Sequence, residues 1–134
     1  MIRNLRLILV VLFLWYCKDV NMSRPVLSTH VLDTSTGTPA PGVFVELYKM
    51  TNATWTLWHS TVTTNDGRAL FPFTKESMAE GTYKLMFKVG DYYKTLEKET
   101  LYPYVEITFN TRDDQHYHIP LLLSPYGYST YRGS

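Results

Sequence analysis

The sequence predicts an all-β protein, a sandwich or barrel of about eight strands with one short helix. From Val26 onward, apolar and polar residues alternate mostly with a period of two, which is typical of half-buried strands. Turn-forming residues recur roughly every eight to twelve positions, as they do in sandwiches and barrels. The 134 residues are 45% hydrophobic and 19% charged, which indicates one ordinary globular domain.

The alternation divides the chain into eight expected strands. Gly and Pro mark the breaks between them, at 36–42, 65–67 and 124–127, because Gly tolerates positive φ and Pro presets φ. The expected strands cover residues 27–33, 43–50, 55–64, 68–71, 82–89, 103–110, 115–124 and 127–132.

One segment departs from the β pattern. Residues 91–98 begin with Asp91, a residue suited to a helix N-cap, and could form two helical turns with Tyr92 or Tyr93 and Leu96 facing inward. We expect this to be the only regular helix. Residues 74–80 are expected to make at most a short helical turn.

Residues 1–22 differ in character from the rest of the chain. Arg3 and Arg6 precede an apolar run of eleven residues, 7–17. That run is too short to span a bilayer, which takes roughly 20 residues, but it is typical of a secretory signal peptide. The sequence leaves two interpretations open: a signal-peptide-like leader, or an extension outside the fold with Met22 as an alternative translation start. Either way, the domain covers residues 23–134.

Charge and cysteine content exclude several classes of function. Residues 1–22 hold three of the 13 basic and one of the 12 acidic residues, which leaves 10 against 11 in the domain. Such a surface has no general attraction for phosphate backbones, so we expect no nucleic-acid partner and no membrane partner. Cys17 is the only cysteine, so the domain has no disulfide and no thiol ligand for a metal.

The strand faces carry the candidate functional residues. On strand 27–33, His30 shares a face with Ser28 and Leu32. On strand 115–124, one face carries His116, His118, Pro120 and Leu122, and the opposite face, Tyr117, Ile119, Leu121 and Leu123, is the expected core. A half-apolar outer face predicts burial by another subunit, hence a homo-oligomer. Taken singly, each histidine could also be a surface imidazole without a role.

The last eighteen residues combine aromatic residues and an arginine in a hairpin pattern that runs to residue 134. Termini usually fray, so this pattern predicts that Tyr131, Arg132 and Ser134 are held in place and contribute to a site. His116 and His118 have the spacing to chelate a metal from one strand face, but no third ligand is evident, and we expect no metal site.

Segments 27–34, 64–68 and 117–134 together resemble the transthyretin-related family, and specifically its 5-hydroxyisourate hydrolase branch. The resemblance covers residues 26–134, and its most specific element is the terminal Tyr131-Arg132-Gly133-Ser134, which marks the hydrolase branch. It implies a transthyretin-like sandwich of two sheets, assembled as a homotetramer, a dimer of dimers with the active sites in a central channel. By the same resemblance, the catalytic residues are His30, Arg68 and His118, and the substrate-binding residues are Tyr131, Arg132 and Ser134.

The implied reaction is hydrolysis of 5-hydroxyisourate to 2-oxo-4-hydroxy-4-carboxy-5-ureidoimidazoline in urate degradation, without a cofactor. His118 or His30 would deprotonate water, and Arg68 would stabilise the oxyanion. The alternative is a transthyretin-like carrier of a small, thyroid-hormone-type ligand without catalysis. Family members are commonly peroxisomal or cytoplasmic, whereas a working signal peptide would place the chain in the secretory pathway.

Overall fold

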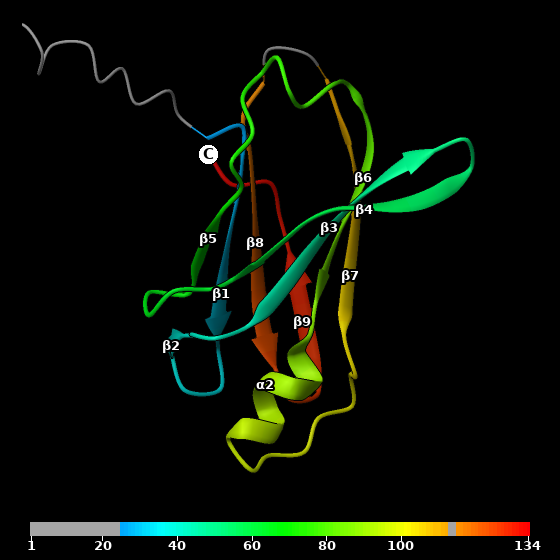
Figure 1. The fold of residues 1–134 in the computed structure, drawn as a ribbon. Coiled ribbons are helices and arrows are strands. Elements are labelled where there is room, and N and C mark those ends of the chain that lie inside the picture. The colour runs from blue at the N-terminus through cyan, green and yellow to red at the C-terminus, as the bar shows by residue number, and fades with distance from the viewer. Residues whose placement is uncertain (1–24, 113–114) are drawn as a thin grey trace, which may run out of the picture.

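Two β-sheets pack face to face, as Figure 1 shows, and confirm the predicted all-β sandwich. The computed structural model describes residues 25–112 and 115–134. The strands of these residues are β1 (Leu27–Asp33), β2 (Thr38–Pro39), β3 (Phe44–Thr51), β4 (Thr54–Val62), β5 (Arg68–Leu70), β6 (Gly81–Phe87), β7 (Val105–Thr111), β8 (Tyr117–Ser124) and β9 (Gly127–Thr130), with one helix, α2 (Val89–Thr95).

The first sheet has the strand order β2-β1-β8-β9, and β5 pairs with β1 on the same edge as β2. The pairing of β1 with β8 is parallel, and every other pairing in the two sheets is antiparallel. Parallel neighbours need a long crossover connection, and here the whole second sheet lies between β1 and β8 in the chain.

The second sheet has the order β4-β3-β6-β7. Along β1, β6 and β8, fully buried residues alternate with partly exposed ones over most of their length, so one face of each strand packs into the space between the sheets. The largest side chains that are fully buried there are Tyr83, Tyr93, Phe71, Phe87, Leu27, Leu47, Leu85, Leu121 and Leu123.

The predicted strands agree with the observed ones to within a few residues, but the helix is shifted. α2 begins at Val89 rather than at Asp91, which lies in the first turn instead of at the N-cap. Tyr92 and Tyr93 are both buried, although the pattern required only one of them to face inward, whereas Leu96 is 45% exposed because the helix ends before it. The two-residue strand β2 was not predicted.

The N-terminal segment assigned to a leader or extension, residues 1–22, lies outside the described residues. Within the described ranges, no helix is long and apolar enough to cross a membrane.

A buried carboxylate ties the helix to the first sheet. Asp33 ends β1 with only 1% of its surface exposed, and the Tyr92 hydroxyl donates a hydrogen bond to its Oδ2 at 3.1 Å. The Ser35 backbone N–H donates to Asp33 Oδ1 at 3.0 Å. Buried carboxylates need such partners, and these fix α2 at the end of the sandwich opposite the C-terminus (Figure 1).

The C-terminal tail is held, as predicted, although β9 ends at Thr130 rather than at residue 132. Gly133 forms an antiparallel bridge with His118, and its N–H donates to the His118 carbonyl oxygen at 2.7 Å. The chain end therefore lies beside the start of β8.

We expect Gly67→Ala to destabilise the fold. Gly67 has φ +76°, and an added Cβ would lie 2.4 Å from the Val31 carbonyl oxygen, which is backbone and has little freedom to move. Backbone strain and this clash together should lower the free energy of unfolding by at least about 2 kcal/mol. Urea unfolding followed by circular dichroism measures the change.

Gly37→Ala is the matched control, because Gly37 also has positive φ (+70°) but no atom within 4 Å of an added Cβ. It should cost only the conformational strain, about 1 kcal/mol. Equal losses in the two variants would contradict the role given to the Val31 contact.

Candidate active site

Three neighbouring strands bring the predicted catalytic residues onto the outer face of the first sheet. In the antiparallel β1–β5 pair, His30 lies opposite Arg68. In the parallel β1–β8 pair, Ser28 lies opposite His118. Residues two apart on a strand share a face, so these four side chains lie on one surface although they come from three distant parts of the sequence.

A cavity of about 270 Å³ opens at this surface. Arg68, His118 and Ser134, three of the six predicted site residues, line it together. Its volume is just below the usual range of ligand pockets, so it suits a small ligand. The full lining is Pro25, Ser28, Arg68, His116, Tyr117, His118, Gly133 and Ser134.

The His118 imidazole is held from two sides. Its Nδ1 lies 2.8 Å from the Ser28 hydroxyl oxygen. Gly133 packs directly against the ring, so closely that an added Cβ would lie 2.4 Å from His118 Cδ2. The tail can approach to this distance only because residue 133 has no side chain.

The environment favours the neutral form of His118. Burial lowers the pKa of the imidazole, and the positive charge of Arg68 and the neighbouring His30 lower it further, while a backbone hydrogen bond to Ser28 acts in the opposite direction. His118 is therefore uncharged at neutral pH and able to accept a proton.

The turn before β5 positions Arg68. The Asp66 Oδ2 lies 3.6 Å from Arg68 Nε, and the Arg68 N–H donates to Asp66 Oδ1 at 3.2 Å. The Thr64 hydroxyl also donates to Asp66, and this hydrogen bond is the main cause of the lowered pKa of that carboxyl group. The guanidinium is about half exposed and keeps donors available for a ligand.

His30 lies at the margin of the site and does not line the cavity. Its Nε2 is 2.8 Å from the Asp66 carbonyl oxygen. A carbonyl oxygen only accepts, so Nε2 carries the proton in this contact. His30 acts on His118 electrostatically and braces the turn that holds Arg68.

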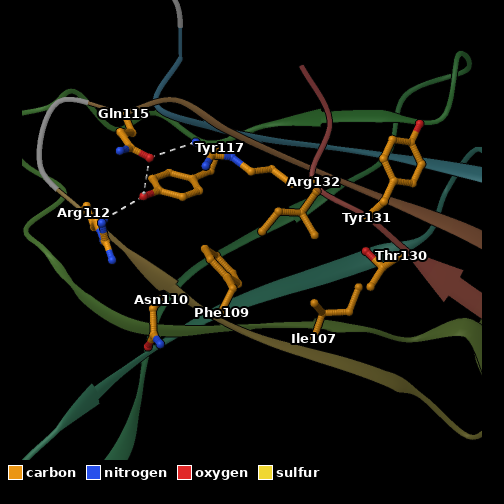
Figure 2. A pocket seen from close by; sticks show the side chains of 10 residues that line it. Ile107, Phe109, Asn110, Arg112, Gln115, Tyr117, Thr130, Tyr131 and Arg132 are labelled. Carbon is orange, nitrogen blue, oxygen red and sulfur yellow. Dashed lines mark hydrogen bonds between the residues drawn. The ribbon is translucent and has the colours of Figure 1, made fainter.

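Tyr131 and Arg132 do not line the histidine cavity of this chain. Both line a larger cavity of about 550 Å³ at the open edge between the sheets (Figure 2). The Arg132 guanidinium lies 4.8 Å from the centre of the Tyr117 ring and donates to Gln115 Oε1 at 3.0 Å. Tyr131 is 55% exposed, and its ring extends away from this cluster. The alternation of side-chain faces along the expected strand 127–132 does not extend to these residues, because β9 ends at Thr130.

The two cavities differ in chemistry. The larger one contains no histidine or carboxylate side chain, whereas the smaller one combines a neutral imidazole, a guanidinium and hydroxyl groups. Across residues 25–112 and 115–134, no group of three or more His, Cys, Asp or Glu residues could hold a metal ion. The neutral imidazole of His118 is the group in the smaller cavity with the chemistry of a general base, and the guanidinium of Arg68 lines the same cavity.

Sequence reasoning missed the contribution of Ser28. Strand alternation placed it on the face of His30, but its contact with His118 depends on the pairing of strands that are 90 residues apart. His116 was assigned correctly to the face of His118, and it lines the same cavity without having been named as a site residue.

Known proteins share much of this sequence. A probable 5-hydroxyisourate hydrolase of Caenorhabditis elegans is 49% identical over 109 residues, which cover 81% of each chain. The 5-hydroxyisourate hydrolase of Mus musculus is 43% identical over 111 residues, 81% of this chain and 94% of the mouse protein.

Solved structures share the fold. The 5-hydroxyisourate hydrolase of Klebsiella pneumoniae superimposes with a TM-score of 0.71 at 38% identity, covering 81% of this chain and 92% of that one. Sea bream transthyretin in complex with thyroxine gives a TM-score of 0.77 at 27% identity, covering 81% and 94%. Residues 27–133 match the HIUase/Transthyretin family, and the chain belongs to that family.

Proposed function

We propose that this protein hydrolyses 5-hydroxyisourate to 2-oxo-4-hydroxy-4-carboxy-5-ureidoimidazoline. The observation that carries the proposal is the meeting of His118, Arg68 and Ser134 in one small cavity. The relatives named as 5-hydroxyisourate hydrolases, at 43–49% identity over most of the chain, support the same substrate.

In the proposed mechanism, His118 is the general base. It takes a proton from a water molecule as the water oxygen attacks a ring carbonyl carbon of the substrate. The tetrahedral intermediate then collapses, the ring C–N bond breaks, and the proton returns to the leaving nitrogen from His118. A neutral imidazole with a lowered pKa suits this cycle at neutral pH.

Arg68 stabilises the negative charge that develops on the carbonyl oxygen, through the planar donor fork of its guanidinium. Ser134, which lines the same cavity, contacts the substrate. His30 holds the Asp66 turn and orients Arg68. Arg132 anchors the tail through Tyr117 and Gln115, which replaces the direct substrate contact first expected of it.

A carrier function has less support. Fold similarity does not separate the two branches, because the chain superimposes on a transthyretin at least as well as on a hydrolase. A carrier, however, needs no neutral imidazole beside a guanidinium, and the curated relatives at 43–49% identity are named as hydrolases.

The dimer of dimers stays a prediction. Large apolar side chains are exposed near the β8–β9 turn, with Tyr126 at 68% and Tyr128 at 45%, and burial of such residues by a partner subunit would be favourable.

Arg68→Ala should abolish most of the activity without unfolding the protein, since the Arg68 side chain is about half exposed. Removal of one such electrostatic donor typically lowers turnover about 100- to 1,000-fold. Freshly generated 5-hydroxyisourate is added to the purified chain, and its decay is followed by ultraviolet absorbance against the spontaneous rate. Arg112→Ala, which removes an arginine of the other cavity, serves as the control and should keep its activity. A wild-type rate equal to that of buffer would end the hydrolase proposal.

Gly133→Ala should impair catalysis through the position of His118. The added methyl group must displace either the imidazole or the tail. A displacement of about 1 Å in a catalytic group can cost about 100-fold in rate, so we expect a loss of that order. In Gly127→Ala the new Cβ meets only the Ser124 hydroxyl, at 3.6 Å, and this variant should retain normal rates. Equal rates in both variants would show that the tail does not set the imidazole position.

The pH dependence should follow the titration of His118. Because the catalytic form is neutral and its pKa is lowered, kcat/KM should stay high below the usual histidine value of about 6.5 and fall only as pH drops through the lowered pKa. Arg68→Ala removes a positive neighbour and should therefore raise the pKa of His118. Nuclear magnetic resonance titration of the imidazole measures it in both proteins, and an unchanged or lower pKa in the variant would refute this electrostatic coupling.

A further inference from the structure

The Ser28–His118 contact is built into the sheet. Ser28 and His118 are paired directly across the parallel β1–β8 ladder, so their side chains project from neighbouring strands on the same face. The hydroxyl oxygen and Nδ1 are 2.8 Å apart, within normal hydrogen-bonding distance, and the contact is partly buried. Both residues line the smaller cavity.

A histidine that acts as a general base must have one unprotonated nitrogen facing its target. In the neutral ring, one nitrogen carries a hydrogen atom and the other carries a lone pair. The hydrogen-bond partner of one ring nitrogen decides which of the two is protonated. In His118, Nδ1 is engaged by Ser28. Among the described residues, none forms a hydrogen bond with Nε2, so Nε2 is the nitrogen left for water.

We propose that Ser28 is a positioning residue: its hydroxyl oxygen accepts a hydrogen bond from His118 Nδ1–H and so keeps Nε2 unprotonated for catalysis. This inference rests on the proposed hydrolase function and on His118 as the base.

The contrast with His30 separates the roles of the two histidines. The Asp66 carbonyl oxygen requires the proton of His30 on Nε2, so the tautomer of His30 is the opposite of the one proposed for His118. His30 is outside the cavity lining and His118 is part of it. The two rings therefore differ in both location and tautomer, and of these two histidines His118 is the one that lines the cavity.

Ser28→Val and Ser28→Thr form a matched pair of variants for the test. Val and Thr have nearly the same shape and both suit a strand, but only Thr carries a hydroxyl group. The decay of 5-hydroxyisourate is measured for both and for wild type, with thermal unfolding as the check on folding. We expect Ser28→Val to lose about 10- to 100-fold in kcat with little change in KM, as found when outer partners that orient histidine ligands are removed. Ser28→Thr should recover most of that loss.

The tautomer itself is measured without activity. At a pH above the His118 pKa, long-range ¹⁵N–¹H spectra of the imidazole distinguish a protonated from an unprotonated nitrogen, and a His118→Gln variant assigns the signals. Wild type and Ser28→Thr should show a protonated Nδ1 and an unprotonated Nε2. Ser28→Val should show a mixture, or the reverse tautomer.

Two results would overturn the inference: a protonated Nε2 in wild type, or a folded Ser28→Val protein with wild-type kcat. Both differ from failure of the proposed function, in which wild type itself does not accelerate decay of the substrate. In that case the ¹⁵N spectra still decide whether Ser28 sets the tautomer of His118.

Discussion

The parallel pairing of β1 with β8 is the interaction on which the rest of the structure depends. It joins segments some 90 residues apart, and all strands of the second sheet lie between these segments in the chain. Its register places Ser28 against His118, and β5, paired to the other edge of β1, adds Arg68 opposite His30. A shift of one residue in either ladder would turn these side chains into the apolar core, because strand faces alternate with a period of two. Core packing and active-site geometry are thus set by the same register.

The site works through a balance between burial and charge. Partial burial of His118 lowers the pKa of its imidazole, and the cation beside it lowers that pKa further, so the ring that we propose as the base is neutral at neutral pH. The Asp66 carboxylate holds Arg68 through an ion pair with Nε and a hydrogen bond from the Arg68 backbone N–H. The cation therefore remains available both to keep His118 neutral and to receive negative charge from a substrate.

Much of this architecture could be predicted from local pattern, and the remainder depends on contacts between distant segments. Alternation located the strands and the faces of His30 and His118 because it is a property of each strand alone. The helix was placed two residues late because Asp91 looked like an N-cap, whereas tertiary packing of the preceding Val89 starts the helix earlier. The tail was correctly expected to be held, but Arg132 is turned to the other cavity by its contacts with Tyr117 and Gln115.

β5 is a three-residue strand that pairs with β1 alone, yet it carries the guanidinium of the site. Buried Ala69 and the following Phe71 attach it to the core, while Arg68 and Leu70 are exposed. Short strands at a sheet edge are among the first parts of a protein to open in local fluctuations. The position of Arg68 thus depends on a short edge strand: we expect the amide hydrogens of β5 to exchange with solvent ahead of those of β8, and activity to be lost on heating before the whole sandwich unfolds.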